Sequence, residues 1–348
     1  MRKLATLAKI EEIRPIENAD RIEKIRIRDW WVVSEKGNFK IGDFAVYFEV
    51  DSLLPSSNPI FQFLANNTSE KIMIHDNKEY KGYRLKTKKI KGTLSQGLAL
   101  PMKLFTNIDF TGMLESADIS EKLNIVKYEK PISAQLGGFV KGPFPSFIPK
   151  TDEERVQNLG DLVKQKAGTI MYVTEKINGS STTYYKKDGI LGVCSRNLEL
   201  LENEGNTLWK IAKTYKMREN IPNNIAIQGE LVGEGIQNNP LKLHGQDFYV
   251  FNVFDITKQK FHTLEEMEMF CKEHELTIIP VLDRTYILQE HVNEILEAAE
   301  GFSTIAPTMI REGIVIRPLQ EEIVEIDGYP TRFSFKAISN TFLLQEKE

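Results

Sequence analysis

Cysteine is scarce in this chain, because its 348 residues include only Cys194 and Cys271. Two cysteines cannot hold a zinc ion by themselves, and so few thiols are typical of a protein from a reducing compartment. The segment Cys271-Lys-Glu-His274 has the spacing of a ligand pair, but the surrounding pattern indicates an amphipathic helix. We therefore expect neither a disulfide framework nor a metal site there.

The chain also lacks long apolar runs and an excess of positive charge. No segment approaches the roughly 18 apolar residues that a membrane-spanning helix needs, and the apolar stretch at the N-terminus is too short for a signal peptide. We therefore expect a cytoplasmic protein. The net charge of -4 argues against a general polycation, so nucleic acid would have to bind a local basic surface. A Walker-type phosphate loop is missing as well.

The length allows two domains, and the first part of the chain indicates short strands. The stretch from Ile25 to Arg28 alternates with a period of two and is expected to continue as a strand to Val33. A further strand from Phe44 to Val50 follows a Gly42-Asp43 turn. Such segments favour a small barrel or sandwich.

The densest basic run of the sequence extends from Arg84 to Gly92. Strand alternation would place three cations on one face and Leu85 on the other, while the last two lysines lie near a turn. We predict a weak RNA-binding surface here, although a solvated strand face explains the pattern equally well. Its candidate residues are Arg84, Lys86, Lys88, Lys89 and Lys91.

Helix signatures occur only in the second part of the chain. After a Pro- and Gly-rich segment from 137 to 149, which indicates a linker or an ordered crossing segment, Thr151 to Glu154 has the form of a capping box and predicts a helix to about Leu162. Thr263 to Glu266 predicts another helix, and a third is expected from 291 to 300.

The hexapeptide Thr174-Glu-Lys-Ile-Asn-Gly179 places Lys176 just after a predicted strand, 170–174, and before an Asn-Gly turn. A lysine amine attacks phosphorus or carbonyl carbon only in its neutral form, which desolvation or a neighbouring positive charge favours. The Lys-x-x-Gly pattern is weak by itself because it recurs at Lys89 and Lys186. The residues that follow must decide among the three lysines.

Five further patterns follow Lys176 in order, and each has an ordinary structural explanation when it is taken alone. They are Ser195-Arg196-Asn197 after a strand-like run, Gly229-Glu230 on an apolar strand, the aromatic strand that ends in Phe254-Asp255, Glu312-Gly313 before another strand, and Lys336 on the last strand.

In this order the patterns resemble the motifs of the covalent nucleotidyltransferase superfamily, which contains ATP-dependent ligases and RNA-capping enzymes. The resemblance covers about 151 to 344. Lys186 fits the usual Lys-x-Asp-Gly motif better than Lys176, but Asp188-Gly189 predicts an exposed hairpin turn, which gives a nucleophile no dry pocket. Lys89 precedes the carboxylates by a long stretch of chain. Lys176 is therefore the predicted nucleophile.

Within the superfamily, Glu175-Lys-Ile-Asn-Gly-Ser180 most resembles RNA ligases that seal nicks in duplex RNA. The segments 15–21, 42–48 and 92–97 resemble an OB-fold module that precedes the ligase domain in one subgroup. The resemblance implies an α+β fold, with an N-terminal OB-like β-barrel at 1–130, a linker at 131–150, and a mixed α/β nucleotidyltransferase domain of ATP-grasp-like ligase type, built on antiparallel sheets, at 151–348. The chain ends soon after Lys336, so we expect no C-terminal OB domain.

The resemblance also implies a mechanism: Lys176 takes AMP from ATP, AMP passes to an RNA 5′-phosphate, and a 3′-hydroxyl then displaces it. Glu230 and Glu312, with Asn178, would hold Mg²⁺ or Mn²⁺ directly or through water, and Lys336 would contact the α-phosphate. Nucleotide binding is assigned to Glu175, Ile177, Asn178, Gly179, Arg155, Arg196, Phe254, Ile314, Ile316 and Arg317. Among these, Phe254 would stack on adenine, with Ile314 or Ile316 on the other face.

Two positions depart from the family pattern. Asn178 replaces the usual aspartate, which weakens a contact that prefers an anion. The last motif often carries two lysines, and here Arg317 or Arg332 would have to replace the second one.

The expected substrate is a nicked duplex that contains RNA, and a monomer is assumed. Three alternatives stay open. They are a ligase for junctions of an RNA 3′ end with a DNA 5′ end, a guanylyltransferase, which the expected lack of a C-terminal module disfavours, and a non-catalytic OB-fold RNA-binding protein, which the retained lysines and carboxylates disfavour.

Overall fold

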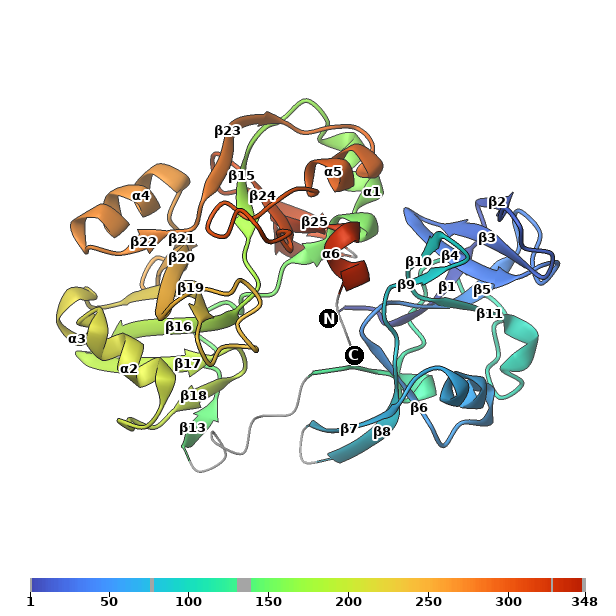
Figure 1. The fold of residues 1–348 in the computed structure, drawn as a ribbon, viewed down its shortest axis with the longest axis horizontal. Coiled ribbons are helices and arrows are strands. Elements are labelled where there is room, and N and C mark those ends of the chain that lie inside the picture. Colours follow the sequence, from blue (N-terminus) through green and yellow to red (C-terminus); the bar gives the residue numbers. More distant parts are fainter. Residues whose placement is uncertain (1, 76–77, 130–138, 327, 346–348) are drawn as a thin grey trace. The chain divides into compact units, whose positions relative to one another are not determined.

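The computed structural model describes residues 2–75, 78–129, 139–326 and 328–345. The chain divides into two compact units, Met1–Ile132 and Ser133–Glu348, and each is described by itself (Figure 1). Both units are rich in strands. No helix in the described ranges has the length and apolar character that crossing a membrane requires.

The N-terminal unit is built almost entirely of short strands in four small sheets. Three short 3-10 helices, η1 (Pro59–Asn66), η2 (Met102–Leu104) and η3 (Glu121–Leu123), join them. The strands are β1 (Ala5–Lys9), β2 (Glu12–Pro15), β3 (Ile22–Ile27), β4 (Trp30–Glu35), β5 (Phe44–Phe48), β6 (Ser52–Pro55), β7 (Glu70–His75), β8 (Lys78–Arg84), β9 (Lys88–Ile90), β10 (Thr93–Ser95), β11 (Leu98–Pro101) and β12 (Val126–Lys127).

Strand β5 separates the two hydrophobic cores of this unit. Its side chains alternate, so Tyr47 packs into one buried cluster with Ile25 and Trp30, and Phe48 packs into the other with Phe61 and Phe105. Both faces of β5 are therefore buried, which explains why its sequence is apolar throughout rather than alternating.

Two sequence predictions for this unit were wrong in detail. The expected strand from Ile25 to Val33 is a hairpin: β3 ends at Ile27, the turn includes Arg28 with a φ of 53°, and β4 begins at Trp30. The basic run is not one strand either, because β8 ends at Arg84 and β9 begins at Lys88. Alternation survives the turn of the β3–β4 hairpin, so a period of two alone could not locate that break.

The C-terminal unit contains two main sheets. The larger has the order β13-β18-β17-β16-β19-β20-β21, with β22 paired to β20, and the smaller has the order β14-β27-β24-β15-β23. The strands are β13 (Val140–Pro143), β14 (Glu154–Arg155), β15 (Ile170–Lys176), β16 (Ser180–Lys187), β17 (Ile190–Ser195), β18 (Leu198–Leu200), β19 (Ile225–Gly233), β20 (Gln246–Asp255), β21 (Lys260–Phe261), β22 (Thr277–Ile278), β23 (Val281–Ile287), β24 (Gly313–Pro318), β25 (Ile323–Ile326), β26 (Tyr329–Arg332) and β27 (Phe335–Ile338).

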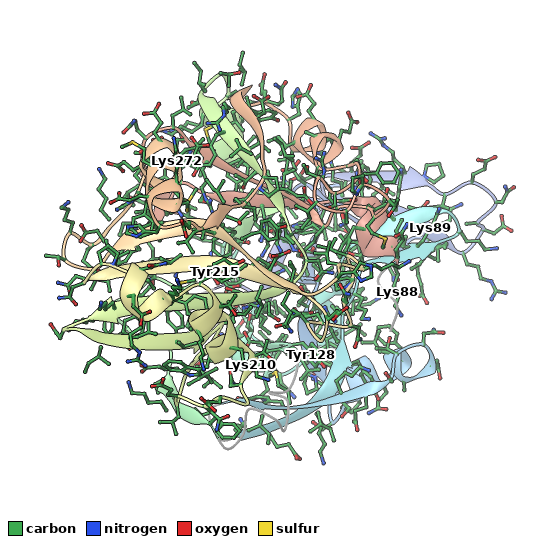
Figure 2. All side chains as sticks on the ribbon, turned by 60° about the vertical axis from the view of Figure 1, so that its left-hand side comes forward. Lys88, Lys89, Tyr128, Lys210, Tyr215 and Lys272 are labelled. Atoms are coloured by element: carbon green, nitrogen blue, oxygen red, sulfur yellow. The ribbon has the colours of Figure 1, made fainter. Side chains whose placement is uncertain are left out.

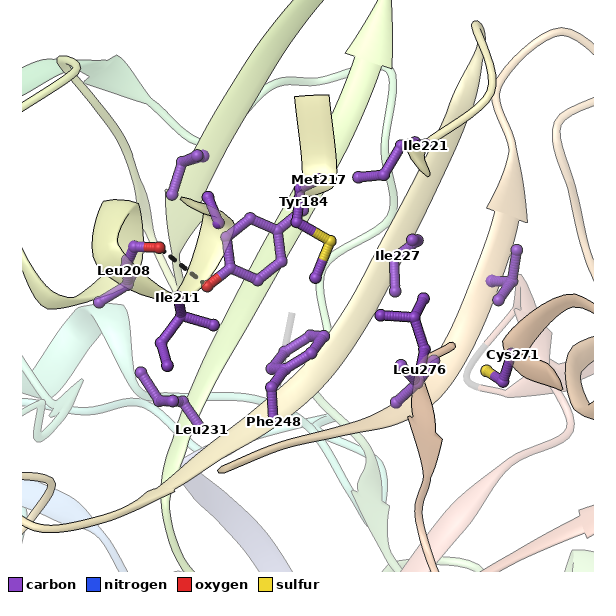
Figure 3. Close-up of a cluster of buried hydrophobic side chains, with 14 of the residues drawn as sticks. Tyr184, Leu208, Ile211, Met217, Ile221, Ile227, Leu231, Phe248, Cys271 and Leu276 are labelled. Atoms are coloured by element: carbon purple, nitrogen blue, oxygen red, sulfur yellow. Dashed lines mark hydrogen bonds between the residues drawn. The ribbon is translucent and has the colours of Figure 1, made fainter. Parts of the chain in front are cut away.

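Helices cover one face of each main sheet. The helices of this unit are α1 (Gly160–Gln165), α2 (Thr207–Thr214), α3 (Met217–Asn220), α4 (Leu264–Glu273) and α5 (Val292–Ala298), with a 3-10 turn η4 (Val156–Asn158); α6 (Asn340–Gln345) follows the last strand and buries no side chain. Side chains of α2 and α4 join the core of the larger sheet, where Tyr184 donates a hydrogen bond to the carbonyl oxygen of Leu208 at 3.0 Å (Figure 3). Residues of α5 and η4 pack on the smaller sheet.

The three helix predictions had different outcomes. The capping box at Thr263 is present, with reciprocal bonds to Glu266, and it opens α4. The helix expected from 291 is α5. The helix expected from Thr151 is wrong: β14 and η4 occupy this stretch, α1 begins only at Gly160, and the Thr151 hydroxyl forms a 2.7 Å hydrogen bond with the Ser181 hydroxyl.

The segment predicted as a linker contributes to the larger sheet. Val140–Pro143 forms β13, which pairs with β18, and the Phe144 side chain is buried beside Tyr185. The first part of the predicted linker, 131–138, lies outside the described residues.

Candidate active site

Lys176 ends β15, where the strand pairs with Gly313 at the start of β24. A Cβ atom at Gly313 would lie 2.1 Å from the Ala337 carbonyl oxygen, so only glycine allows β27 to approach this closely. Glu312 directly precedes this glycine, and the Lys176 Nζ donates to its Oε2 at 2.7 Å. The predicted nucleophile and one predicted carboxylate are therefore in contact, and both side chains are partly exposed.

Gly179 connects the lysine segment to the second carboxylate. Its backbone N–H donates to Glu230 Oε1 at 3.0 Å, and β16 then runs antiparallel to β19, which carries Glu230. A Cβ atom at Gly179 would lie 2.4 Å from the Leu231 carbonyl oxygen. The glycine of this motif is thus required by the close approach of β19.

Burial raises the pKa of Glu230 to about 7, because it penalises the charged carboxylate. The charge of Glu312 raises this pKa further, whereas Lys176, the Gly179 N–H and Arg196 lower it. Two carboxylates and one ammonium therefore share one site. Perturbed carboxyl groups beside a lysine are typical of active sites.

The carboxylates suit a hard divalent cation. Mg²⁺ and Mn²⁺ prefer oxygen ligands, and Mg²⁺ usually keeps several waters besides one or two carboxylates. The described residues contain no group of three or more His, Cys, Asp or Glu that could hold a metal alone. Glu230 and Glu312 therefore fit an ion that substrate oxygens and water complete, and half-buried Asn178 lies in the same motif.

Lys336 lies in a row of residues across the smaller sheet. Thr174 pairs with Val315, Val315 pairs with Lys336, and Lys336 pairs with Arg155. Directly paired residues of neighbouring strands project from the same face. Lys176 shares this face with Thr174 by alternation, so the structure brings together both predicted lysines and Arg155, which is 8% exposed.

The structure places Ile314 and Ile316, which the sequence analysis assigned to the nucleotide, away from this face of the sheet. Both side chains belong to the buried cluster on the other face of the smaller sheet, together with Phe335. Val315 is the apolar residue of β24 that shares a face with Lys336. Val315 and the two isoleucines thus lie on opposite faces of β24.

Phe254, which the sequence analysis assigned to adenine stacking, is buried among other aromatic side chains. Its ring is 2% exposed, packs with Phe144, and lies 4.9 Å from the Phe261 ring, centroid to centroid. No face of the Phe254 ring is left for a base. Phe251 on the same strand packs instead with Ile177, one residue after the lysine, and is only partly buried.

The two residues that flank Lys176 are both buried and fixed. Glu175 is 1% exposed, and its Oε2 accepts the Thr304 backbone N–H at 2.7 Å. Ile177 is 2% exposed in a cluster with Val232 and Ala306. The loop that contains Thr304 therefore contributes to this site, which no pattern in the sequence indicated.

Arg317, which the sequence analysis assigned to the nucleotide, is buried and engaged by other residues of the unit. It is 2% exposed, its guanidinium forms an ion pair with Glu153 at 2.9 Å, and it donates to Ser334 and to the Phe251 carbonyl oxygen. Burial disfavours the charge of Glu153, but Arg317 and Arg332 hold its pKa below the usual range. Arg317 therefore ties three segments together.

The other two arginines differ in exposure. Arg332, the alternative to Arg317, forms an ion pair with Glu321 and lies 3.9 Å from the centre of the Phe261 ring. Arg196 follows β17, is 43% exposed, and contacts Asp152. Its charge acts on Glu230, so Arg196 lies near the carboxylates, as expected for a nucleotide or RNA contact.

The competing Lys-x-x-Gly lysines lie elsewhere. Lys186 pairs with Ile225 at the opposite end of β19 from Glu230, next to the hairpin turn at Asp188-Gly189. Lys89 belongs to β9 of the N-terminal unit. Of the three lysines, Lys176 alone forms a contact with one of the predicted carboxylates among the described residues.

The basic run forms part of the N-terminal unit but does not act as one surface. Arg84 forms an ion pair with Asp51 at 2.6 Å, and Lys88 donates to the Asn67 carbonyl and the Thr68 hydroxyl. Lys88 and Lys89 are neighbours on β9 (Figure 2), yet only Lys89 is exposed. Lys86 is half-buried, and Lys91 is exposed at the turn after β9.

Comparisons with known proteins agree with this geometry. Residues 169–338 match the RNA ligase family, and residues 4–102 match an OB-fold domain. The comparison with curated proteins found no match. Among solved structures, this chain is similar to a lysine variant of Naegleria gruberi RNA ligase with ATP and Mn. The two sequences are 40% identical, the match covers 98% of each chain, and the TM-score is 0.85.

Two other structures of the same protein are similar to this chain. A glutamate variant with ATP and Mn is 40% identical over 100% of both chains, with a TM-score of 0.86. A lysine-to-methionine variant with AMP and Mn is 40% identical over 98% of both chains, with a TM-score of 0.85.

The fold and the site define a nucleotidyltransferase domain that follows an OB-fold domain. The chain belongs to the RNA ligase family. The family and the fold class predicted from the sequence are both confirmed.

Proposed function

We propose that this RNA ligase uses ATP and Mg²⁺ or Mn²⁺ to join a 3′-hydroxyl to a 5′-phosphate at nicks in RNA-containing duplexes. The observation that carries the proposal is the contact between Lys176 Nζ and Glu312 Oε2 beside Glu230. The ATP, AMP and Mn of the Naegleria gruberi structures support the choice of cofactors.

The first step forms a covalent adduct on Lys176. Its Nζ attacks the α-phosphorus, a nitrogen–phosphorus bond forms, the bond to the pyrophosphate oxygen breaks, and pyrophosphate leaves. Glu312 lies 2.7 Å from Nζ and orients the amine through a hydrogen bond. Lys336, on the same face of the sheet as Thr174, offsets the negative charge of the α-phosphate.

Two further transfers complete the reaction. An oxygen of the RNA 5′-phosphate attacks the bound AMP, which releases Lys176 and leaves AMP on the RNA end. The 3′-hydroxyl then attacks the 5′-phosphorus, and AMP departs. A divalent metal held by Glu230 and Glu312, with Asn178 in contact directly or through water, supplies charge neutralisation at the phosphates.

Adenine binds beside the residues that flank the nucleophile. Phe251 stacks on the base, because it is a partly buried ring in the cluster of Ile177, and Val315 provides the apolar surface of β24. Glu175 lies next to this cluster and accepts a hydrogen bond from the base. Arg155 and Arg196 contact phosphates of the nucleotide or the RNA.

The N-terminal unit binds RNA, with Lys89 and Lys91 as phosphate contacts. Both are exposed, whereas Arg84 and Lys88 are engaged by other residues of the unit. The protein acts as a monomer in the cytoplasm. The two free, buried thiols are typical of a reducing compartment.

A set of four nicked duplexes tests the substrate. The strands on the 3′-hydroxyl side and the 5′-phosphate side of the nick are each RNA or DNA, and sealing is followed on denaturing gels with ATP and Mg²⁺ or Mn²⁺. We expect sealing with RNA on both sides. Sealing only of an RNA 3′ end to a DNA 5′ end would replace this proposal with a junction ligase, and adduct formation with GTP rather than ATP would indicate a guanylyltransferase.

A further inference from the structure

The loop between β19 and β20, residues 234–245, contacts the segment that follows Lys176. The Gln237 Nε2 donates to the Gly179 carbonyl oxygen at 2.7 Å. Gly179 donates its own N–H to Glu230, so both backbone polar groups of this glycine are held by side chains. Lys176 and the residues after it are therefore fixed by Glu312, Glu230 and Gln237.

The loop has an unusual backbone at the residue that makes this contact. Gln237, Asn238 and Asn239 are consecutive non-glycine residues with φ of 46°, 62° and 50°. Left-handed conformations are common for glycine and tolerated by asparagine, but they are costly for glutamine, and they rarely occur in succession. Backbone strain of this kind persists only where the surrounding structure determines it.

Two buried anchors impose this conformation. Ile236 is 7% exposed in the core of the larger sheet, and Leu241 is 6% exposed in the cluster that contains Ile177. The chain must therefore cross from one cluster to the other within five residues. Asn239 closes the loop by two hydrogen bonds with the backbone of Leu243, at 2.8 and 3.0 Å.

We infer that Gln237 is a positioning residue for the ligase: the loop 234–245 holds the Gln237 amide against the Gly179 carbonyl, which fixes the segment between the nucleophile Lys176 and the carboxylate Glu230. This inference rests on the proposed function. The Gln237 amide binds the backbone of the Lys176 segment, so we assign it the role of orienting the groups that react. The strained turn is needed to direct the Gln237 side-chain amide toward the Gly179 carbonyl oxygen.

Three variants separate positioning from stability. Gln237→Met keeps the length of the side chain and the left-handed backbone but removes the donor. Gln237→Gly removes the donor and also relieves the backbone, and Asn238→Gly relieves the same turn but leaves the contact with Gly179 intact. Each is measured by thermal unfolding and by the single-turnover rate of label transfer from α-labelled ATP to the protein.

We expect Gln237→Met and Gln237→Gly to lose about tenfold in rate at saturating ATP, with KM for ATP changed less than threefold. We expect the unfolding temperature of Gln237→Gly to be no lower than that of the wild type, so a loss of stability would not explain its lower rate. Asn238→Gly keeps the wild-type rate. Wild-type rates in both Gln237 variants, or an equal loss in Asn238→Gly, would overturn the inference. No label on the wild type would instead overturn the proposed function itself.

Discussion

Single residues of this ligase determine its chemistry through their charge. Lys176 is placed between Glu312, which it contacts, and Glu230, whose pKa burial raises to about 7. A buried carboxyl group that is easily protonated is a poor stabilising group but a good site for a cation, because a bound metal supplies the missing counter-charge. The site is thus built for a ligand at the expense of stability.

The substitution Glu230→Gln should stabilise the metal-free protein at alkaline pH. The folded protein retains a proton on Glu230 between pH 4.5 and about 7 that the unfolded chain has lost. The stability that this proton provides is full below pH 4.5 and is lost as the pH rises through 7. Glutamine removes the charge and still accepts the Gly179 N–H.

Urea unfolding in the presence of a chelator checks this expectation. At pH 8 the variant should be more stable than the wild type by about 1–3 kcal/mol, and the difference should disappear near pH 5. Label transfer from ATP should be lost in the same variant. A variant that is less stable at pH 8 than at pH 5, relative to the wild type, would contradict the raised pKa.

Substituting two of the aromatic residues of β20, Phe251 and Phe254, tests the adenine site. Phe251→Ala should raise KM for ATP in label transfer about tenfold or more, because stacking on a base contributes about 1–3 kcal/mol. Phe254→Leu should lower the unfolding temperature and leave KM unchanged, because its ring is buried against Phe261. The opposite pattern would restore the sequence-based assignment of Phe254.

At the scale of strands and helices, the sequence predicted some features better than others. The order of motifs grouped Lys176, Glu230 and Glu312, and the structure brings them close together: Lys176 ends β15, Glu230 lies on β19, and Glu312 directly precedes β24. It was harder to predict from the sequence which face of a strand each side chain occupies. The pairing of β19 with β20 shifts at Gln228 and Gly229, and β24 begins only after Glu312, so counting by two from a motif residue gives the wrong side.

Whether a capping-box sequence began a helix depended on whether the same residues pair with a strand. Thr263 is the N-cap of α4 and Glu266 lies in its first turn, where no neighbouring strand among the described residues competes for their hydrogen bonds, so their mutual bonds determine the local structure. Thr151 precedes two residues that pair with β27, and this strand pairing replaces the helix that the box predicts. A helix signal in the local sequence is therefore overridden where a neighbouring strand can pair with the same residues.

Removing the cap of α4 tests this difference. Thr263→Ala should lower the free energy of unfolding by about 1 kcal/mol, because the first turn of the helix loses a hydrogen bond to the Glu266 N–H. The rate of label transfer should stay at the wild-type value, since α4 packs on the larger sheet away from the lysine segment. An unchanged unfolding curve would show that the box contributes nothing.

On the scale of the whole molecule, the proposed function assigns adenylylation to the C-terminal unit and RNA binding to the N-terminal unit. The lysine, both carboxylates and the adenine cluster all belong to the C-terminal unit. Lys89 and Lys91 belong to the other unit. Changes in the N-terminal unit should therefore affect steps that involve RNA and spare the first step.

The double substitution of Lys89 and Lys91 by alanine checks this division. Label transfer from ATP should be unchanged, while RNA affinity should fall and its dependence on salt should weaken by about two phosphate contacts. Lys210→Ala, which removes an exposed lysine of α2 in the other unit (Figure 2), serves as the charge control and should bind RNA like the wild type. Equal loss in both proteins would indicate a general charge effect.

The location of the AMP adduct tests the central claim most directly. The wild-type protein is incubated with ATP and Mg²⁺ or Mn²⁺, digested, and its peptides are mapped by mass spectrometry. We predict AMP on Lys176, in an acid-labile nitrogen–phosphorus bond, and no adduct in Lys176→Ala, while Lys186→Ala is modified normally. AMP on Lys186 or Lys89, or an adduct of equal yield in Lys176→Ala, would contradict the account.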